Sequence, residues 1–363
     1  MTHWLDKLWR SNIVYDEPIC FSESDHSDFI GGSLLYTPTQ ILKISSSDGT
    51  QQYELNKDFQ WDGYKITRTK NSSIPFLPRS LYCLAYREEA DTAWLRLADQ
   101  RRYCNVFPEI PDYQALVTYR HNDQWKGSIP CSQMSFLPHT LKKLTADEPF
   151  RLVFYGDSIT AGWEASGYDE TVIDMVTLKE LRIKNHKPPF MPAWAELVTA
   201  ALKAHYRHNN IIKINRGAGG STSSWGSKHA AALVNPEHPD LVILAFGMNN
   251  MQKEPDAFKK DILDIIATIC CTSPNCEFLL VSPMVPNPEI YGFMKNKLLE
   301  QERSLFQIQT SLTGIAVAPI HTIFLDLLNM DKNYLELTGN CINHPNDFSI
   351  RIYAQAILSC FGV

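Results

Sequence analysis

Five short apolar runs in the second part of the chain constrain its fold most. Each is a continuous hydrophobic segment, and they lie at residues 151–156, 211–215, 241–246, 277–282 and 314–319. Continuous runs of this length are typical of strands that are covered on both faces. Between them, apolar residues recur at helical spacing, as in 194–202, 258–269 and 294–312. This alternation predicts a three-layer α/β/α domain with a parallel sheet.

The first 146 residues follow a different pattern and are predicted to form an all-β sandwich or jelly-roll domain. Short runs rich in β-formers are separated by turn sequences, and they lie at 32–36, 41–44, 64–69 and 115–119. Trp61, Trp94 and Trp125 are expected to fill a small β-core, the alternative being a sugar-stacking face. Prolines and charges at 137–149 indicate the boundary, so we expect domains at 1–146 and 147–363.

A serine follows the first apolar run at a place where a helix can begin. Ser158 stands in Gly156-Asp157-Ser158, and the unpaired N–H groups at a helix N-terminus favour an oxyanion. The alternative is that Asp157 and Ser158 only cap the helix. Three further polar stretches follow in order, and they are 215–222, 247–250 and 343–346. Because ligands bind at the carboxyl ends of parallel strands, we expect Ser158 and the first two of these stretches to meet there.

Together the four stretches resemble the sequence blocks of the SGNH or GDSL hydrolases, which are serine esterases and acylhydrolases with a flavodoxin-like fold. The resemblance covers roughly residues 150–360. It implies that Ser158 is the nucleophile and that His344 is the general base. It also implies an oxyanion hole formed by the backbone of Ser158, the backbone of Gly220 and the side chain of Asn249. The two-part chain is similar to two-domain carbohydrate esterases.

One position departs from the family pattern, which has an aspartate three residues before the histidine. Cys341 stands there, and a thiol is poorly suited to stabilise an imidazolium. We expect a Ser-His dyad whose ring is oriented by a backbone carbonyl. Asp347 is an alternative third member, although a residue that begins the last helix is more simply its N-cap. The third alternative is a slow or degenerate enzyme.

The segment 163–192 is long for a connection in a compact domain. Such a segment is either a lid or substrate-binding insertion, or a surface excursion without a role.

Composition limits the possible partners. With a net charge of −6 among 363 residues, the chain offers no basic stripe for nucleic acid and no attraction to anionic membranes. The first residues lack a signal-peptide pattern, and nine cysteines without framework spacing fit reduced thiols, so we expect a cytoplasmic protein. No motif for a metal or cofactor stands out, and a small-molecule or carbohydrate ester is the expected substrate. The oligomeric state stays open.

The expected reaction is hydrolysis of a carboxylic ester with a short acyl group, such as acetyl on a carbohydrate. One alternative is an acyltransferase that uses the same residues, with an alcohol other than water as the acceptor. The other is a catalytically degenerate carbohydrate-binding protein, which the cysteine at position 341 suggests.

Overall fold

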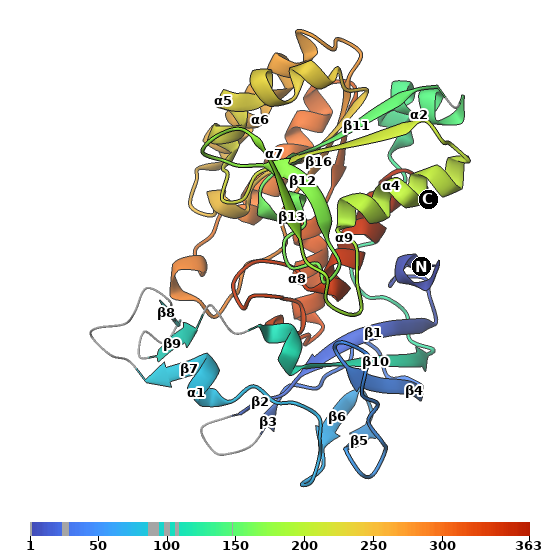
Figure 1. Ribbon diagram of the computed structural model, residues 1–363, viewed down its shortest axis with the longest axis vertical. Helices are drawn as coiled ribbons and strands as arrows, with labels where there is room; N and C mark the ends of the chain where they lie inside the picture. The colour runs from blue at the N-terminus through green and yellow to red at the C-terminus, as the bar shows by residue number, and fades with distance from the viewer. Residues whose placement is uncertain (1, 24–28, 86–93, 98–101, 106–108, 147) are drawn as a thin grey trace.

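A five-stranded parallel sheet forms the centre of the second part of the chain. The computed structural model describes residues 2–23, 29–85, 94–97, 102–105, 109–146 and 148–363 (Figure 1). In spatial order the strands are β14 (Ile211–Gly217), β11 (Phe150–Gly156), β15 (Leu241–Ala245), β16 (Glu277–Val281) and β17 (Ile315–Ala318). All neighbouring pairs are parallel. The five strands predicted from the apolar runs are therefore confirmed.

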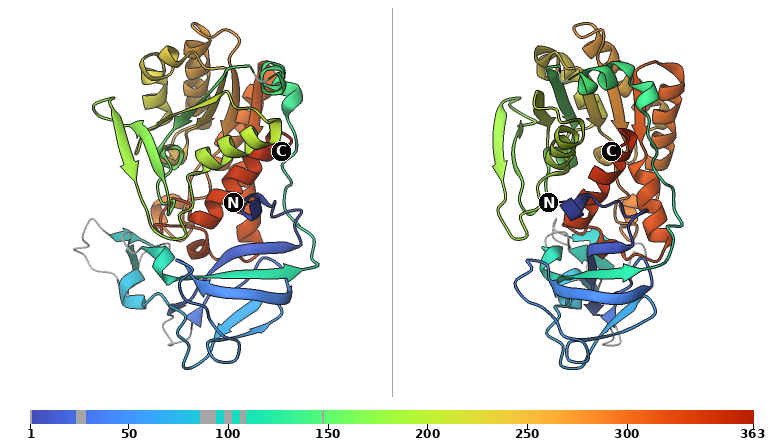
Figure 2. Two further views of the ribbon diagram at one scale, coloured as in Figure 1. Left: turned by 45° about the vertical axis from the view of Figure 1, so that its right-hand side comes forward. Right: turned by 90° about the vertical axis from the view of Figure 1, so that its right-hand side faces the viewer.

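Successive strand residues face two separate hydrophobic cores, which explains why the runs are apolar throughout. Phe154 packs into one core and Tyr155 into the other, because side chains alternate across a strand. The first core contains buried residues of α4 (Trp194–Tyr206) and α9 (Asp347–Cys360). The second contains residues of α5 (Ser223–Leu233), α6 (Pro255–Cys270) and α7 (Leu298–Ser311). The three-layer α/β/α arrangement is confirmed (Figure 2).

The first part of the chain is rich in antiparallel strands, consistent with a β-sandwich. Its main sheet has the order β1 (Ile13–Cys20), β10 (Gln114–His121) and β4 (Pro38–Ser46). Two further sheets have two strands each, β2 (Ser22–Glu23) with β3 (Phe29–Ile30) and β5 (Phe59–Asp62) with β6 (Lys65–Arg68). Another has three strands in the order β7 (Cys83–Ala85), β9 (Arg102–Asn105) and β8 (Trp94–Arg96). We call residues 13–121 the β module.

Two details of the β module differ from expectation or extend it. The run at 32–36 is not a strand, since Ser33 makes only an isolated bridge to Lys65. Two glycines with positive φ at 31 and 32 bend the backbone there, and Leu34 is then buried from an irregular segment. Trp61 and Trp125 pack against the core, as expected for core aromatics. The side chain of Trp94 lies outside the described residues.

The segment 163–192 forms a hairpin of its own on the edge of the parallel sheet. Its strands are β12 (Asp169–Ile173) and β13 (Glu180–Lys184). Glu170 attaches the hairpin to β14, because its carboxylate accepts from Lys213 Nζ at 2.7 Å and from Asn215 Nδ2 at 3.4 Å. The insertion is therefore an ordered element that begins directly after the serine block.

A buried charge cluster connects the β module to the end of the chain. Lys332 is completely buried and pairs with Glu17 at 2.8 Å and with Glu336 at 2.9 Å. Glu336 also accepts from the backbone N–H of Cys20 at 3.0 Å and of Gly32 at 3.1 Å. The loop that precedes α9 thus contacts β1 and the segment that follows it (Figure 1).

The division of the chain after residue 146 remains a prediction. Helix α2 (Pro138–Thr145) precedes that point, yet it packs on the parallel-sheet part. The backbone N–H groups of His139 and Thr140 donate to Glu277 at 2.9 and 2.7 Å, which are bonds to the first residue of β16. Among the described residues, no helix combines the length and the hydropathy needed to cross a bilayer.

Candidate active site

Ser158 lies beyond the carboxyl end of strand β11, the second strand of the sheet, as the first residue of a short helix, α3 (Ser158–Ala161). The preceding residue, Asp157, caps this helix by accepting from Ile159 N–H at 3.0 Å. Gly156 makes the tight turn possible, because a Cβ there would lie 2.2 Å from the carbonyl oxygen of Ala245. Ser158 is 5% exposed. The cap assigned to Asp157 therefore exists, and it places the neighbouring serine at the helix start.

The structure brings His344 to this serine across 186 residues of sequence. Ser158 Oγ and His344 Nε2 lie 2.8 Å apart, which is hydrogen-bond distance. The loop that carries the histidine is fixed by Asn340, whose Oδ1 accepts from the N–H groups of Ile342, Asn343 and His344 at 3.0 to 3.1 Å. The imidazole is held where it can exchange a proton with the hydroxyl.

Two backbone N–H groups near the serine are available as donors. Within the part of the chain that the structure describes, neither Ser158 N–H nor Gly220 N–H donates to a protein acceptor. Gly220 has a φ of +78°, a left-handed conformation that glycine adopts without strain. The turn at Gly220 can therefore leave its N–H free for an acceptor outside the protein.

Asn249 is exposed and lies in the turn after β15, in the 3-10 helix η5 (Met248–Asn250). Its Nδ2 donates to Ser221 O at 2.9 Å, which leaves the second hydrogen of the amide for another acceptor. The adjacent Asn250 is buried and accepts from Ser223 N–H at 2.9 Å. This bond attaches the turn to the start of α5, so Asn249 is presented on a fixed backbone.

The carboxylate closest to the histidine ring comes from a residue that the sequence did not single out. Glu164 Oε1 lies 3.6 Å from His344 Nδ1. That distance is an ion-pair contact, and His344 Nδ1 is buried without a hydrogen-bond partner among the described residues. Glu164 is the second residue of the 163–192 insertion, and its φ of +70° turns the chain back toward the histidine. Gly339 allows the approach, because a Cβ there would lie 2.8 Å from Glu164 Cβ.

The two residues weighed as a third member occupy other places. Asp347 Oδ1 accepts from Ser166 N–H at 2.9 Å. It is the first residue of α9, and the cap of that helix is Asn346, which accepts from Ser349 N–H at 3.1 Å. Cys341 is fully buried in a cluster with Cys20, and its carbonyl oxygen accepts from Asn287 Nδ2 at 2.7 Å. Its φ of +63° forms part of the tight turn before His344.

Burial raises the pKa of two carboxyl groups beside the site. Burial raises the pKa of Asp157 to about 6, against the opposing effect of its bond from Ile159 N–H and of the His344 charge. Burial likewise raises the pKa of Asp347 to about 6. Hydrogen bonds oppose this effect of burial on the pKa in both groups, from Ile159 N–H to Asp157 and from Ser166 to Asp347.

Two side chains cover the space next to the N–H groups of Ser158 and Gly220. Trp163 stands edge-on to the imidazole of His344, with ring centroids 6.0 Å apart. A Cβ on Gly219 would meet the Trp163 ring at 3.2 Å, and one on Gly220 would lie 3.8 Å from Met175. Both covering residues belong to the 163–192 insertion. The space beside the serine is therefore small.

Among the described residues, no group of three or more His, Cys, Asp or Glu side chains is arranged to hold a metal ion. The arrangement at Ser158 brings a serine hydroxyl, an imidazole and backbone N–H groups close together.

Several solved structures are similar to the chain in fold. One is a two-domain esterase active on acetylated mannans, co-crystallized with mannopentaose, with 22% sequence identity and a TM-score of 0.47, over 64% of this chain and 54% of that one. Another is an acetylxylan esterase from Geobacillus stearothermophilus, with 18% identity and a TM-score of 0.45, over 59% and 94% of the two chains. A third is a lipase/acylhydrolase from Enterococcus faecalis, with 18% identity and a TM-score of 0.41, over 58% and 93%. The match thus spans about half the length of the two-domain esterase.

No curated protein matches the sequence. The family model of the GDSL-like lipase/acylhydrolases matches residues 154–348, more than half of the 363-residue chain. This range contains Ser158, Gly220, Asn249 and His344. The chain therefore belongs to the GDSL-like lipase/acylhydrolase family.

Proposed function

We propose that this enzyme hydrolyses short-chain carboxylic esters through an acyl-Ser158 intermediate. The observation that carries the proposal is the 2.8 Å contact between Ser158 Oγ and His344 Nε2 at the carboxyl end of β11. In the first step, His344 takes the hydroxyl proton while Ser158 Oγ attacks the carbonyl carbon. The charge that develops on the carbonyl oxygen is stabilised by Ser158 N–H, Gly220 N–H and Asn249 Nδ2.

The second half of the reaction uses the same groups in reverse. The tetrahedral adduct breaks its bond to the alcohol oxygen, and His344 returns the proton to that leaving group. Water then attacks the acyl-serine, with His344 as base, and releases the acid. The contact between serine and histidine favours this enzyme over a degenerate binding protein.

A small acyl group fits the space beside the serine. The Trp163 ring and Met175 occupy the positions next to Gly219 and Gly220, where a longer chain would have to extend. We therefore propose acetyl as the acyl group. The similarity of the two-part sequence to carbohydrate esterases supports a sugar as the alcohol.

Covalent trapping tests the proposed nucleophile. A fluorophosphonate reacts with an activated serine by forming a P–O bond and releasing fluoride, so the wild-type chain should gain one phosphonyl group on the peptide that contains Ser158. Ser158→Ala should remain unlabelled, and the exposed-serine control Ser224→Ala should be labelled like wild type. The same preparation should hydrolyse p-nitrophenyl acetate in the presence of EDTA. A label on another serine of the wild-type enzyme would contradict the assignment.

We also propose that Glu164 is a positioning residue that orients the His344 ring and stabilises the imidazolium. Glu164→Gln removes the charge while keeping the shape, and we expect kcat/KM for p-nitrophenyl acetate to fall about 10- to 100-fold, less than in a buried triad. Because the carboxylate would act on the ring only when it becomes charged in the transition state, the loss should fall mainly on kcat, with KM little changed.

The split between kcat and KM separates positioning from mere structural support. Glu164→Asp keeps the charge, and aspartate tolerates the positive φ at this position, so it should keep more of the wild-type kcat than the glutamine variant does. Glu148→Gln, the same change at an exposed glutamate before β11, should leave kcat and KM unchanged. A dyad oriented without Glu164 predicts the same kcat for wild type and Glu164→Gln.

A further inference from the structure

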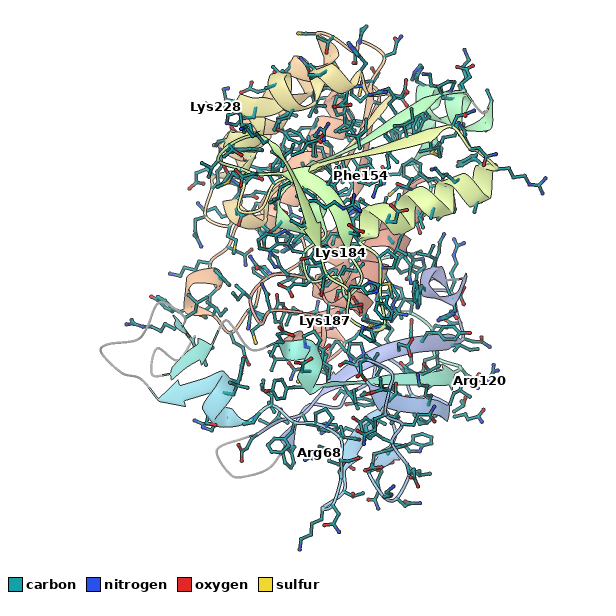
Figure 3. All side chains as sticks on the ribbon, viewed as in Figure 1. Arg68, Arg120, Phe154, Lys184, Lys187 and Lys228 are labelled. Carbon is teal, nitrogen blue, oxygen red and sulfur yellow. The ribbon has the colours of Figure 1, made fainter. Side chains whose placement is uncertain are left out.

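A cleft of about 700 Å³ lies between the β module and the insertion that carries Glu164. Residues of the β module form one wall, and residues 163–191 with the loop before α9 form the other. Lys187, from the insertion, lies where the two parts of the molecule meet (Figure 3) and pairs with Glu109 across the cleft. A cleft of this volume is within the usual range for a small-molecule site.

The cleft adjoins the catalytic pair through shared residues. Trp163 and Glu164 line it, and the same two side chains contact the His344 ring. Gly339 and Asn340, which hold the histidine loop, line it as well. Because Ser158 and His344 themselves do not line the cleft, it cannot be the acyl site. It is placed to receive the alcohol part of an ester whose acyl group lies at Ser158.

The cleft walls carry more negative than positive groups. Two cationic side chains line it, Lys187 and Arg351, against six carboxyl groups, which are Asp16, Asp48, Glu109, Asp112, Glu164 and Asp347. Both cations already have partners, since Lys187 pairs with Glu109 and Arg351 donates to the carbonyl oxygens of Tyr15 and Asp16. Burial raises the pKa of Asp112, and the neighbouring Glu109 and Asp48 raise it further. A ligand that carries carboxylates, sulfates or phosphates would be repelled.

The remaining polar groups suit a ligand rich in hydroxyls. Several carboxylates accept hydrogen bonds from the chain, as Asp48 does from Thr50 and Asp347 does from Ser166, yet each keeps lone pairs for a hydroxyl donor. Arg351 also lines the cleft, although only 5% of it is exposed. Tyr168 and Trp163 add aromatic surface to the lining.

From these observations we infer that the cleft binds the alcohol moiety of the substrate as an uncharged oligosaccharide and discriminates against polyanionic ones. The inference rests on the proposed esterase function for the fate of the acyl group, while the binding itself is independent of turnover. Asp112 is the residue we expect to govern the discrimination, because it lies in the acidic wall of the β module.

Two substrates and one binding measurement test this inference. We would compare kcat/KM for acetylated xylotetraose, which is neutral, and for acetylated tetragalacturonate, which is a polyanion. Wild type should prefer the neutral ester by at least about 10-fold, and added salt should reduce the preference because it screens the repulsion. Asp112→Arg should reduce that preference about 10-fold, whereas Asp62→Asn, a change at an exposed aspartate of the β5–β6 turn, should not alter it.

Calorimetry with unacetylated xylotetraose separates the two proposals. Wild type and Ser158→Ala should bind it alike, and Asp112→Ala should bind it about 10-fold more weakly. If p-nitrophenyl acetate is hydrolysed but the tetraose does not bind, or binds equally to Asp112→Ala, the cleft inference is wrong and the esterase proposal stands. If the tetraose binds as expected and no ester is hydrolysed, the reverse holds. Thermal unfolding of each variant confirms that it is folded.

Discussion

Ser158→Ala is expected to lower kcat/KM for p-nitrophenyl acetate by about four to six orders of magnitude, as removal of a serine nucleophile does in well-formed sites. In the proposed mechanism this hydroxyl attacks the carbonyl, and no other serine among the described residues lies within hydrogen-bond distance of His344. His344→Ala should cause a loss of similar size, because the neutral hydroxyl is a weak nucleophile without its base. Initial rates under saturating and limiting substrate measure both losses.

The double variant gives the sharper test. When two residues act as one catalytic unit, removing either one abolishes the contribution of both to the rate. Ser158→Ala/His344→Ala should therefore be no slower than the slower of the two single variants. Ser224→Ala and His205→Ala, which change an exposed serine and an exposed histidine, should keep wild-type rates. If either single catalytic variant keeps more than about a tenth of the wild-type activity, the assignment of the pair would have to be abandoned.

The second large effect is expected on stability. Lys332→Met removes the cation from between two buried carboxylates, and we expect the free energy of unfolding to fall by about 3 to 5 kcal/mol at pH 7. Lys332 is completely buried, and its ammonium also donates to Pro18 O at 2.6 Å and Ser33 O at 3.1 Å. Without it, Glu17 and Glu336 are left as neighbouring buried charges. Urea unfolding followed by fluorescence measures the difference.

The pH dependence of the loss identifies its cause. Burial already raises the pKa of Glu336, and removing the lysine charge raises it further. A carboxyl with a raised folded-state pKa takes up a proton more readily when folded, so the deficit of the variant should shrink as the pH falls from 8 toward 5. Glu336→Gln added to Lys332→Met should recover part of the stability, because the amide oxygen can still accept from Cys20 and Gly32.

The matched control is a lysine whose ion pair is exposed. Lys57 pairs with Glu54, and both side chains are 66% exposed. Lys57→Met should leave the free energy of unfolding nearly unchanged, because solvent screens such pairs. Equal losses in the two variants would show that burial of the Lys332 cluster does not increase its contribution to the free energy of unfolding.

The parallel-sheet part could be predicted from sequence because its signal is local. Each strand is apolar on both faces, as Val153 and Phe154 illustrate by packing into opposite cores, and such runs are readable without tertiary information. The segment 32–36 resembles a strand in sequence because it is rich in residues that favour β-structure. Leu34 and Tyr36 are indeed buried, but the positive φ angles of Gly31 and Gly32 give the backbone an irregular course instead.

The residues around Ser158 could be predicted from sequence only where they belong to one of the four short polar stretches. Glu164 was missed because its approach to His344 depends on positive φ at Gly162 and at Glu164 itself and on the missing side chain of Gly339. None of these produces a periodic pattern. One available signal was proximity, since a carboxylate six residues after the serine begins the insertion that covers the site.

The position of the Lys332 cluster has a consequence for the order of events during synthesis. Glu17 is made early, but its buried partner follows 315 residues later in the sequence. At roughly 5 to 20 residues per second, Glu17 is synthesised roughly 15 to 60 s before Lys332. During that interval the Glu17 carboxylate lacks its buried partner and stays hydrated. We expect β1, which is translated before the rest of the β module, to be among the last strands to be buried in the native protein.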